Sequence, residues 1–333
     1  MVKVLVTGAS GFVATHLVQL LDKKGYDIVG TVRSKEKGEK LKSKFSNFEY
    51  EIVGDMTIEG AFDDVLKKYQ FEYLFHTASP FFYDTTEPEK DLIIPAIKGT
   101  ENILASVEKY GTSIKKVVLT SSDAAVYSAE DEQNNKLSFD ESSWNNISYE
   151  DACKDSVYAY YGAKSFAEKY AWEFLKTHDV KFQMTAVNPV YIFGPQVFEE
   201  DAKGKLNTSN QLIGDLLNLT PEEMEKFDNL KGGYVDVRDI AKAHLMAVEN
   251  EDCAGKRLFC YGGKFSNQML LDIVNKNFPQ LKLPIGTAGS GPEDIKELCQ
   301  TSNDATKKLL GFEFNDIEKI VVDVVDQILK SKL

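Results

Sequence analysis

Tyr160 and Lys164 are a pair of residues whose types and spacing could move a proton. Of the 15 tyrosines, Tyr160 is the only one followed by a lysine four residues later. In a helix, residues four apart lie on one face. A free phenol, with a pKa of about 10, is a poor acid at neutral pH, and a nearby ammonium stabilises the phenolate. The spacing therefore indicates a general acid. The alternative is an ordinary helix surface, where both residue types are common.

Two serines that follow an apolar run could bind the atom that receives the proton. Residues 115–120 of "KKVVLTSSDAAVYS" form a strand-like run, and Ser121 and Ser122 stand at its carboxyl end, where open parallel sheets bind ligands. A serine hydroxyl can hold an oxygen of the substrate while the tyrosine donates its proton. With Tyr160 and Lys164, this arrangement suits a carbonyl that receives a hydride from a nicotinamide.

The first strand-to-helix turn carries the pattern expected of a dinucleotide site. In "VLVTGASGFVATHLVQLL", Gly8, Gly11 and Ala14 form G-x-x-G-x-x-A between an apolar strand and an apolar-periodic helix. Glycine lets the backbone amides of the helix N-terminus approach a pyrophosphate, and Ala14 lets the helix pack close to the sheet. We prefer this interpretation to an ordinary turn because the pattern directly follows the first strand.

Two cations at the end of the second strand indicate which dinucleotide binds. Enzymes that prefer NAD usually place an acid there, on the ribose 2′-hydroxyl, whereas this chain has Arg33 and, one turn further, Lys37. A guanidinium can stack on adenine and bind a 2′-phosphate, so the sequence predicts NADPH. Both could instead be solvated surface charges, an objection that is stronger for Lys37. Asp55 and Met56 would receive the adenine, unless Asp55 only closes a turn.

Short β-rich runs alternate with amphipathic stretches, which predicts an α/β fold with parallel strands. We expect a Rossmann-type doubly wound sheet with a smaller, mostly helical C-terminal substrate lobe. Strands are expected in 3–8, 26–32, 48–54, 71–78, 115–122 and 181–189, and helices in 12–24, 58–69, 91–110 and 157–178. The dinucleotide domain would comprise 1–190, with 234–262 returning to it, and the lobe 191–233 and 263–333. The acidic, polar stretch 128–156 is predicted to be a surface excursion.

Composition and charge limit the kinds of partner. The net charge of −13 and the pI near 4.9 argue against nucleic acid or an anionic membrane as the main partner, although they allow a local basic pocket. Four scattered cysteines without a C-x-x-C pair, and four histidines, indicate no metal site. The N-terminus shows no secretory pattern and no apolar run could span a bilayer. We therefore expect a cytoplasmic protein.

Beyond these separate motifs, the chain resembles the extended short-chain dehydrogenases/reductases over essentially all of its length. It is similar in particular to the fungal NADPH-dependent aldehyde and ketone reductases, relatives of the plant dihydroflavonol and cinnamoyl-CoA reductases. The matching segments include "VTGASGFVATHLV", "HTASPF", "GTENIL", "VVLTSS", "YGAKSFAEKYAWEF", "TAVNPVYIFGPQ", "GGYVDVRDIAKAHL" and "KKLLGFEF". The resemblance implies an oxidoreductase that reduces aldehydes and ketones, methylglyoxal among them, to alcohols.

The same resemblance assigns roles to individual residues. Ser122, Tyr160 and Lys164 would form the catalytic triad. The residues that would line the NADPH site are Gly8, Ala9, Ser10, Gly11, Phe12, Val13, Arg33, Lys37, Asp55, Met56, Tyr160, Lys164, Ile192 and Ser209. The residues expected in the substrate pocket, each of which could equally belong to the core, are Phe81, Phe82, Asp123, Val157 and Tyr191.

Two positions depart from the pattern of the family. Asp123 follows the predicted catalytic serine where many members have an aromatic residue, and Ala96 stands where many extended members have a proton-relay asparagine. Asp123 either lines the substrate cleft, where it would disfavour bulky apolar substrates, or caps the loop that begins at Ala124. Ala96 leaves open the route by which the proton is replaced from solvent.

Two other functions share features with this interpretation. A nucleotide-sugar epimerase or dehydratase has the same scaffold and triad, but it usually keeps NAD bound and carries an acid in place of Arg33. A non-catalytic, cofactor-sensing protein would typically lose the tyrosine or the lysine, and this chain has both. The sequence does not distinguish a monomer from a homodimer.

Overall fold

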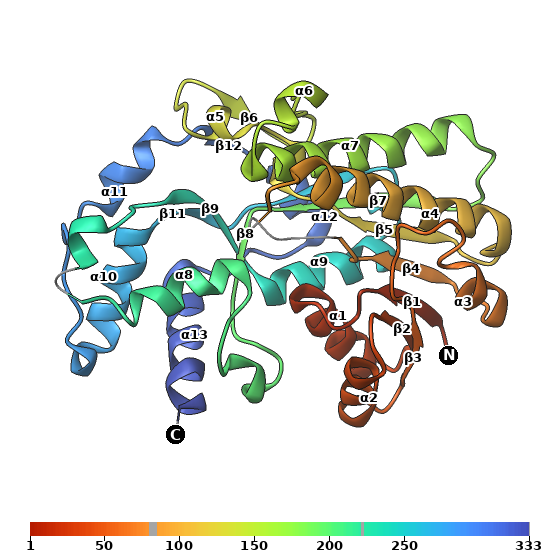
Figure 1. Ribbon diagram of the computed structural model, residues 1–333, viewed down its shortest axis with the longest axis horizontal. Helices are drawn as coiled ribbons and strands as arrows, with labels where there is room; N and C mark the ends of the chain where they lie inside the picture. The colour runs from red at the N-terminus through yellow and green to blue at the C-terminus, as the bar shows by residue number, and fades with distance from the viewer. Residues whose placement is uncertain (80–84, 221–222, 333) are drawn as a thin grey trace.

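A seven-stranded parallel sheet forms the centre of the computed structural model, which describes residues 1–79, 85–220 and 223–332 (Figure 1). The strands lie in the order β10-β7-β5-β4-β1-β2-β3, and every neighbouring pair is parallel. They are β1 (Lys3–Thr7), β2 (Asp27–Val32), β3 (Phe48–Ile52), β4 (Tyr73–His76), β5 (Lys116–Thr120), β7 (Gln183–Pro189) and β10 (Arg257–Cys260). This is the order of a doubly wound sheet, which confirms the predicted fold class.

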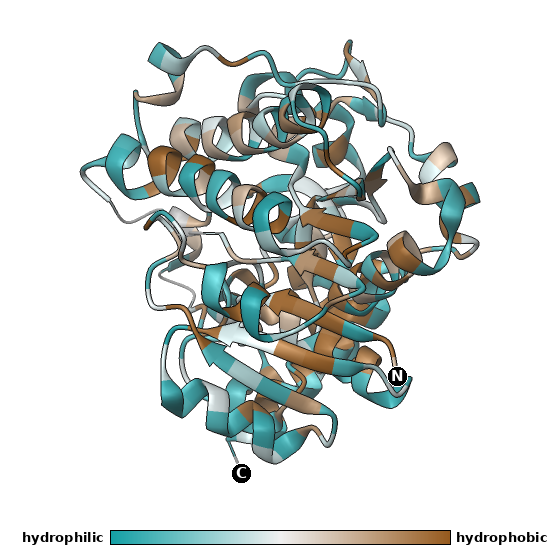
Figure 2. Cartoon of the chain, turned by 90° about the vertical axis from the view of Figure 1, so that its right-hand side faces the viewer, coloured by the Kyte–Doolittle hydropathy of each residue, from teal (hydrophilic) through white to brown (hydrophobic). Residues whose placement is uncertain are grey.

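Helices cover both faces of this sheet. One layer contains α1 (Phe12–Lys23), α9 (Val237–Glu249) and α12 (Asp304–Leu310), and the other contains α3 (Asp63–Lys68), α4 (Ile94–Tyr110) and α7 (Ser156–Thr177). Successive residues of a strand point to opposite faces. Val4 and Val6 accordingly belong to the apolar cluster with α1 and α9, and Leu5 to the cluster with α4 and α7. Figure 2 shows the strands as a brown, hydrophobic centre between helices with teal outer surfaces.

A smaller body is built around a second, three-stranded sheet. Its elements are β8 (Tyr191–Phe193), β9 (Lys231–Asp236), β11 (Gly263–Ser266), α8 (Thr208–Leu216), α10 (Asn267–Asn277) and α13 (Ile317–Ser331). Phe193, Phe265, Leu271 and Val324 are fully or almost fully buried in its core. The sequence division at residue 234 falls inside β9, and the predicted division into domain and lobe stays a prediction. Among the described helices, none is long and apolar enough to cross a membrane.

The polar stretch 128–156 contains more regular structure than a simple surface excursion would. Its elements are α5 (Ala129–Glu132), β6 (Ser138–Phe139) and α6 (Tyr149–Ala152). β6 pairs in parallel with β12 (Gln300–Thr301), which follows α11 (Gly291–Asp294), so the stretch is attached to the C-terminal part of the chain.

Two helices differ from the sequence-based expectation. α2 (Lys35–Lys44) was not expected because "KEKGEKLKSK" is almost entirely polar. Ser34 caps it by accepting from the Lys37 N–H at 3.4 Å, and only two of its residues are buried. The helix expected over 58–69 is the shorter α3, because Gly60 has φ +75°, which no α-helix accommodates.

The order of the strands brings the predicted chemical groups to one edge of the sheet. From β1 the chain continues outward to β2 and β3, whereas from β4 it continues to β5, β7 and β10 on the other side. Ligands of open parallel sheets bind where the order reverses in this way, at the carboxyl ends of the strands. Gly8 follows β1, Arg33 follows β2 and Ser122 comes shortly after β5. They therefore share the carboxyl edge.

Protonation of buried histidines should destabilise this fold below neutral pH. His76 is 3% exposed, and burial lowers its pKa to about 3; burial likewise lowers the pKa of His16 and of His244 to about 4. The unfolded chain binds these protons near pH 6.5 and the folded chain does not. The contribution of these histidines to the free energy of unfolding is therefore fully present above about pH 6.5. It is lost as the pH falls, by up to about 1.4 kcal/mol per histidine and pH unit.

Urea unfolding at about pH 7, 6 and 5 would measure this loss of unfolding free energy. His76→Asn, which can keep the contact that Thr7 Oγ1 makes with the ring at 2.9 Å, should show a shallower decline than the wild type. The control is His178→Asn, at an exposed position, which should show the same decline as the wild type. Equal slopes for wild type and H76N would contradict the assignment.

Candidate active site

Tyr160 and Ser122 are in hydrogen-bond contact although 38 residues separate them. The Tyr160 hydroxyl donates to Ser122 Oγ at 3.1 Å. Ser122 begins the short 3-10 turn after β5, and Tyr160 lies early in α7. Asp155 fixes the start of this helix by accepting from the N–H groups of Val157 and Tyr158 at 2.8 and 3.0 Å. The end of one strand and the cap of one helix thus position the pair.

Lys164 follows one turn after Tyr160 on the same face of α7. Burial lowers the pKa of its ammonium to about 8, and the nearby Glu168 opposes this decrease. The side chain therefore keeps its charge for most of the time at neutral pH. An ammonium on the helix face that carries the phenol can stabilise the phenolate when the proton leaves.

Glu168, a buried acid that the sequence analysis did not single out, contacts Ser121 directly and Ser122 through Asn188. Glu168 Oε2 accepts from Ser121 Oγ at 2.5 Å and from Asn188 Nδ2 at 2.7 Å, and Glu168 Oε1 pairs with Arg257 Nε at 2.6 Å. Asn188 Nδ2 also donates to the carbonyl of Ser122 at 3.0 Å. The spacing could have revealed this acid, because it stands four residues after the predicted catalytic lysine on one helix face.

Backbone hydrogen bonds within the glycine turn after β1, and from it to β2, hold the turn closed. Gly8 has φ +65°, and a Cβ at this position would lie 3.0 Å from the Cα of Ala78, so glycine is required here. The Ala9 N–H donates to the Thr31 carbonyl at 2.9 Å and the Gly11 N–H donates to the Gly8 carbonyl at 2.9 Å. These two amides hold the shape of the turn, and the amides that follow them are the ones available to a ligand.

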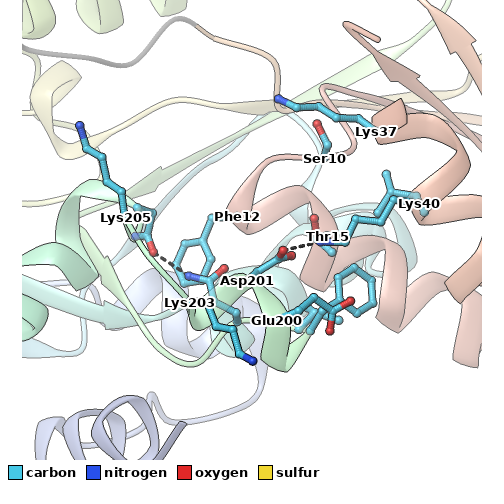
Figure 3. Close-up of a pocket in the computed structure, with 14 residues that line it drawn as sticks. Ser10, Phe12, Thr15, Lys37, Lys40, Glu200, Asp201, Lys203 and Lys205 are labelled. Carbon is cyan, nitrogen blue, oxygen red and sulfur yellow. Dashed lines mark hydrogen bonds and ion pairs between the residues drawn. The ribbon is translucent and has the colours of Figure 1, made fainter. Parts of the chain in front are cut away.

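Two helix N-termini adjoin one cavity beside this turn. In the described part of the chain, no side chain caps α1 after Gly11 or α8 after Asn207. A cavity of about 400 Å³ is lined by Ser10 and Phe12, both shown in Figure 3, and by Asn207. Uncapped N–H groups and the positive ends of helix dipoles favour an anion. Ser10 and Phe12 line this cavity, and Val13 follows them in the first turn of α1; that they bind the phosphates of a dinucleotide stays a prediction.

The charged residues of the same cavity are predominantly basic. They are Lys37, Lys40, Lys203, Lys205, Glu200 and Asp201. Lys37 extends past Ser10, and Lys40 is paired with Asp201 (Figure 3). The surplus of positive charge fits a phosphorylated cofactor. The sequence analysis missed Lys40, Lys203 and Lys205; the last two lie on the segment just before α8, far along the chain from the glycine turn.

The residues predicted to hold the adenine have local partners of their own. Asp55 accepts from the N–H and the hydroxyl of Thr57 at 2.8 and 2.7 Å, so it does close a turn. These hydrogen bonds lower the pKa of Asp55, and Arg33 nearby adds to the decrease. Met56 packs against Gly99, where a Cβ would come within 2.5 Å of its Cε. Arg33 is exposed and does not line the lysine-rich cavity.

Ile192 and Ser209 come from the smaller body. Ile192 is half-buried in the middle of β8, and Ser209 is half-buried in the first turn of α8, whose start adjoins the cavity. Their contacts with a cofactor stay predictions.

Two of the predicted pocket residues, Val157 and Tyr191, lie on α7 and β8. Val157 is 44% exposed in the first turn of α7. Tyr191 lies on β8, with its ring packed edge-on against Phe265 at a centroid distance of 5.5 Å. Phe81 and Phe82 lie outside the described residues. The contacts of these residues with a substrate stay predictions.

Asp123 points inward, with both carboxylate oxygens engaged. It accepts from Ser122 Oγ at 2.7 Å, from the Ala124 N–H at 2.9 Å and from the Tyr127 hydroxyl at 2.9 Å. The capping contact considered from the sequence is therefore present, together with a direct contact to the predicted catalytic serine. Whether Asp123 also meets a substrate stays a prediction.

Comparison with known proteins identifies the family. The model of the NAD dependent epimerase/dehydratase family matches residues 4–259. The chain belongs to this family. Among its relatives, the NADPH-dependent methylglyoxal reductase GRE2 of Saccharomyces cerevisiae is 46% identical over 337 residues, which cover 98% of each chain. The putative NADPH-dependent methylglyoxal reductase GRP2 of Candida albicans is 45% identical over 336 residues, again 98% of each chain.

Solved structures of this family have the same fold. The crystal structure of yeast methylglyoxal/isovaleraldehyde reductase Gre2 complexed with NADPH matches with a TM-score of 0.96 and 46% identity over 99% of both chains. Gre2 of Candida albicans in complex with NADPH matches with a TM-score of 0.96 and 42% identity over 100% of both chains. The predicted family is confirmed, and the reaction and cofactor in the names of these relatives agree with those predicted.

Arg33→Ala should weaken binding of NADPH and have little effect on NADH. Charge-assisted hydrogen bonds to a phosphate contribute roughly 1.5–3 kcal/mol, which corresponds to a loss of about tenfold or more in affinity. Fluorescence titration with both cofactors would give the dissociation constants. Lys35→Ala, which removes an exposed cation two residues further along, is the matched control. Equal losses for NADPH and NADH would instead assign Arg33 to stacking on the adenine.

Proposed function

We propose that this member of the family reduces aldehydes and ketones to alcohols with NADPH, with methylglyoxal and other small carbonyls as substrates. The observation that carries the proposal is the 3.1 Å contact between the Tyr160 hydroxyl and Ser122 Oγ, with Lys164 one turn further on the helix. A proton donor, a group that can hold an oxygen and a cation are thereby brought together at the ligand-binding edge of the sheet. The activity named for the 46% identical yeast relative supports the same reaction.

The reaction divides into a hydride step and a proton step. NADPH supplies the hydride when it is bound. Ser122 would hold the carbonyl oxygen of the substrate, and Tyr160 would donate its phenolic proton to that oxygen. Lys164 would stabilise the phenolate that remains. The products are an alcohol and the oxidised cofactor.

The cofactor would lie along the carboxyl edge, with its pyrophosphate at the start of α1. Arg33 and Lys37 would bind the 2′-phosphate, Asp55 and Met56 the adenine. The remaining proposed contacts are Gly8, Ala9, Ser10, Gly11, Phe12, Val13, Tyr160, Lys164, Ile192 and Ser209. The uncapped helix starts and the surplus of lysines in the cavity support this placement.

The substrate would meet the nicotinamide beside Ser122. The proposed pocket residues are Phe81, Phe82, Asp123, Val157 and Tyr191. The partner is thus a small molecule. We also propose a cytoplasmic location, because all four cysteines have free thiols, as suits a reducing compartment. A monomer and a homodimer are both compatible with this function.

Epimerases and dehydratases of nucleotide sugars are the main alternative on this scaffold. They usually retain NAD and place an acid at the ribose 2′-hydroxyl. This chain has Arg33 at that position and a lysine-rich cavity nearby, which favours an exchangeable phosphorylated cofactor. A cofactor-sensing protein without catalysis would not need the Tyr160–Ser122 contact.

Tyr160→Phe should lower the turnover of methylglyoxal with NADPH by about 10²–10⁴, the usual scale for a general acid, while NADPH affinity stays close to that of the wild type. Steady-state kinetics and cofactor titration would measure both. Tyr158→Phe is the matched control, since Tyr158 lies on the same helix and its hydroxyl contacts Glu130 instead. Near-normal turnover by Y160F would exclude the mechanism.

A further inference from the structure

Ser122 lies between Tyr160 and a buried carboxylate. The Tyr160 hydroxyl donates to Ser122 Oγ at 3.1 Å, and the Ser122 hydroxyl donates to Asp123 Oδ1 at 2.7 Å. The hydroxyl hydrogens of Tyr160 and Ser122 are therefore both donated in the direction of Asp123. A serine hydroxyl has one hydrogen, so while Ser122 donates to Asp123 it has none to offer to Tyr160. To hold the carbonyl oxygen of a substrate, Ser122 has to turn this hydrogen from Asp123 to that oxygen.

Asp123 is held firmly as an acceptor. It is 8% exposed, and besides Ser122 it accepts from the Ala124 N–H and the Tyr127 hydroxyl, both at 2.9 Å. Burial raises the pKa of Asp123, and the three donors oppose this increase because they stabilise the ionised carboxylate.

A second buried acid, Glu132, lies close enough to Asp123 for the charges of the two to interact. Glu132 is 6% exposed; burial and then the charge of Asp123 raise its pKa to about 8. Its Oε2 lies 3.4 Å from the Tyr161 hydroxyl, and within the described chain its Oε1 has no hydrogen-bond partner. Two neighbouring buried acids do not ionise together easily. Asp123 accepts from three donors and Glu132 from the Tyr161 hydroxyl, so the hydrogen bonds favour the carboxylate at Asp123 over one at Glu132.

The remaining ionisable groups near Asp123 do not neutralise it. They are Tyr127, Tyr161, Tyr261 and Cys299, with Lys164 beyond Tyr160 and Arg257 beyond Ala125. Burial raises the pKa of Tyr127, of Tyr261 and of Cys299, the last to about 12, so these three stay uncharged. Arg257 is paired with Glu168.

We propose that Asp123 is a positioning residue that acts through Ser122 to keep Tyr160 in its protonated, proton-donating form; this rests on the proposed role of Tyr160. A hydrogen donated by Ser122 would add to the stabilisation that Lys164 gives a phenolate at Tyr160. Asp123 holds that hydrogen, since charge-assisted hydrogen bonds are roughly twice as strong as neutral ones. Lys164 favours the phenolate and Asp123 favours the phenol, so the two charges set the acidity of Tyr160 between them.

This arrangement favours one direction of the reaction. Reduction of a carbonyl needs the phenol as proton donor, whereas oxidation of an alcohol needs the phenolate as base. With Asp123 present, Tyr160 stays protonated to a higher pH, and carbonyl reduction continues to a correspondingly higher pH.

Asp123→Asn tests the proposal because it keeps the size of the side chain and removes its charge. The ionisation of Tyr160 can be followed by phenolate absorbance, as the difference between each protein and the same protein carrying Tyr160→Phe. The midpoint in D123N should lie about one pH unit below that of the wild type, and turnover in reduction should fall at a correspondingly lower pH. Glu150→Gln, an equal charge change at an exposed residue of α6, should leave the midpoint unchanged.

A midpoint for D123N equal to that of the wild type would overturn the proposal. The route through Ser122 is tested separately: in a Ser122→Ala background, D123N should move the midpoint by less than half as much, and an undiminished shift would show that Ser122 is not involved. Asp123→Ala provides the same test if D123N does not fold. Phenolate absorbance does not depend on turnover, so full activity of Y160F would contradict the proposed function and leave this measurement intact.

Discussion

The ion pair between Glu168 and Arg257 is the interaction on which the geometry of the site depends. Glu168 is fully buried and the Arg257 side chain is 8% exposed, with 2.6 Å between Nε and Oε1. Such a pair is stable only when its members stay together and are hydrogen-bonded, and loss of one partner typically costs about 3–5 kcal/mol. Glu168 also accepts from Ser121 and Asn188, and Arg257 donates to the Ala125 carbonyl. The pair thus joins α7, β10 and the loop after β5.

Charge is distributed unequally between the two ends of the site. At the cofactor end, lysines outnumber acids in the cavity although the whole chain carries a net charge of −13. At the chemical end, Asp123 and Glu132 are buried acids, and Lys164 is a cation one turn after Tyr160 on α7. Local fields of this kind can hold an anionic cofactor at one end and retain protons at the other, whatever the net charge.

Sequence reasoning succeeded where the signal was local and failed where partners were distant. Each range expected to be a strand contains a strand of the large sheet, because apolar β-rich runs bounded by turn residues are typical of strands. Helix α2 escaped notice because its polar sequence has almost no apolar period. Glu168 could have been found from its spacing after Lys164, but Arg257 could not, since nothing near it in the sequence marks a buried cation. For Asp123, the sequence left two alternatives, lining the substrate cleft or capping the loop that begins at Ala124. The structure shows the capping contact and adds a hydrogen bond from Ser122, which neither alternative included.

The sequence by itself determined the strands of the large sheet, most of the helices around it, the glycine turn at Gly8 and the shared helix face of Tyr160 and Lys164, because periodicity, turn residues and four-residue spacing are properties of short segments. Only the tertiary structure decided that Tyr160 touches Ser122, that Ser122 donates to Asp123 and that burial raises the pKa of Glu132. Those outcomes depend on which distant segments pack together and exclude water, because burial and the nearest charge, neither of which is written into neighbouring residues, set the protonation state of each group.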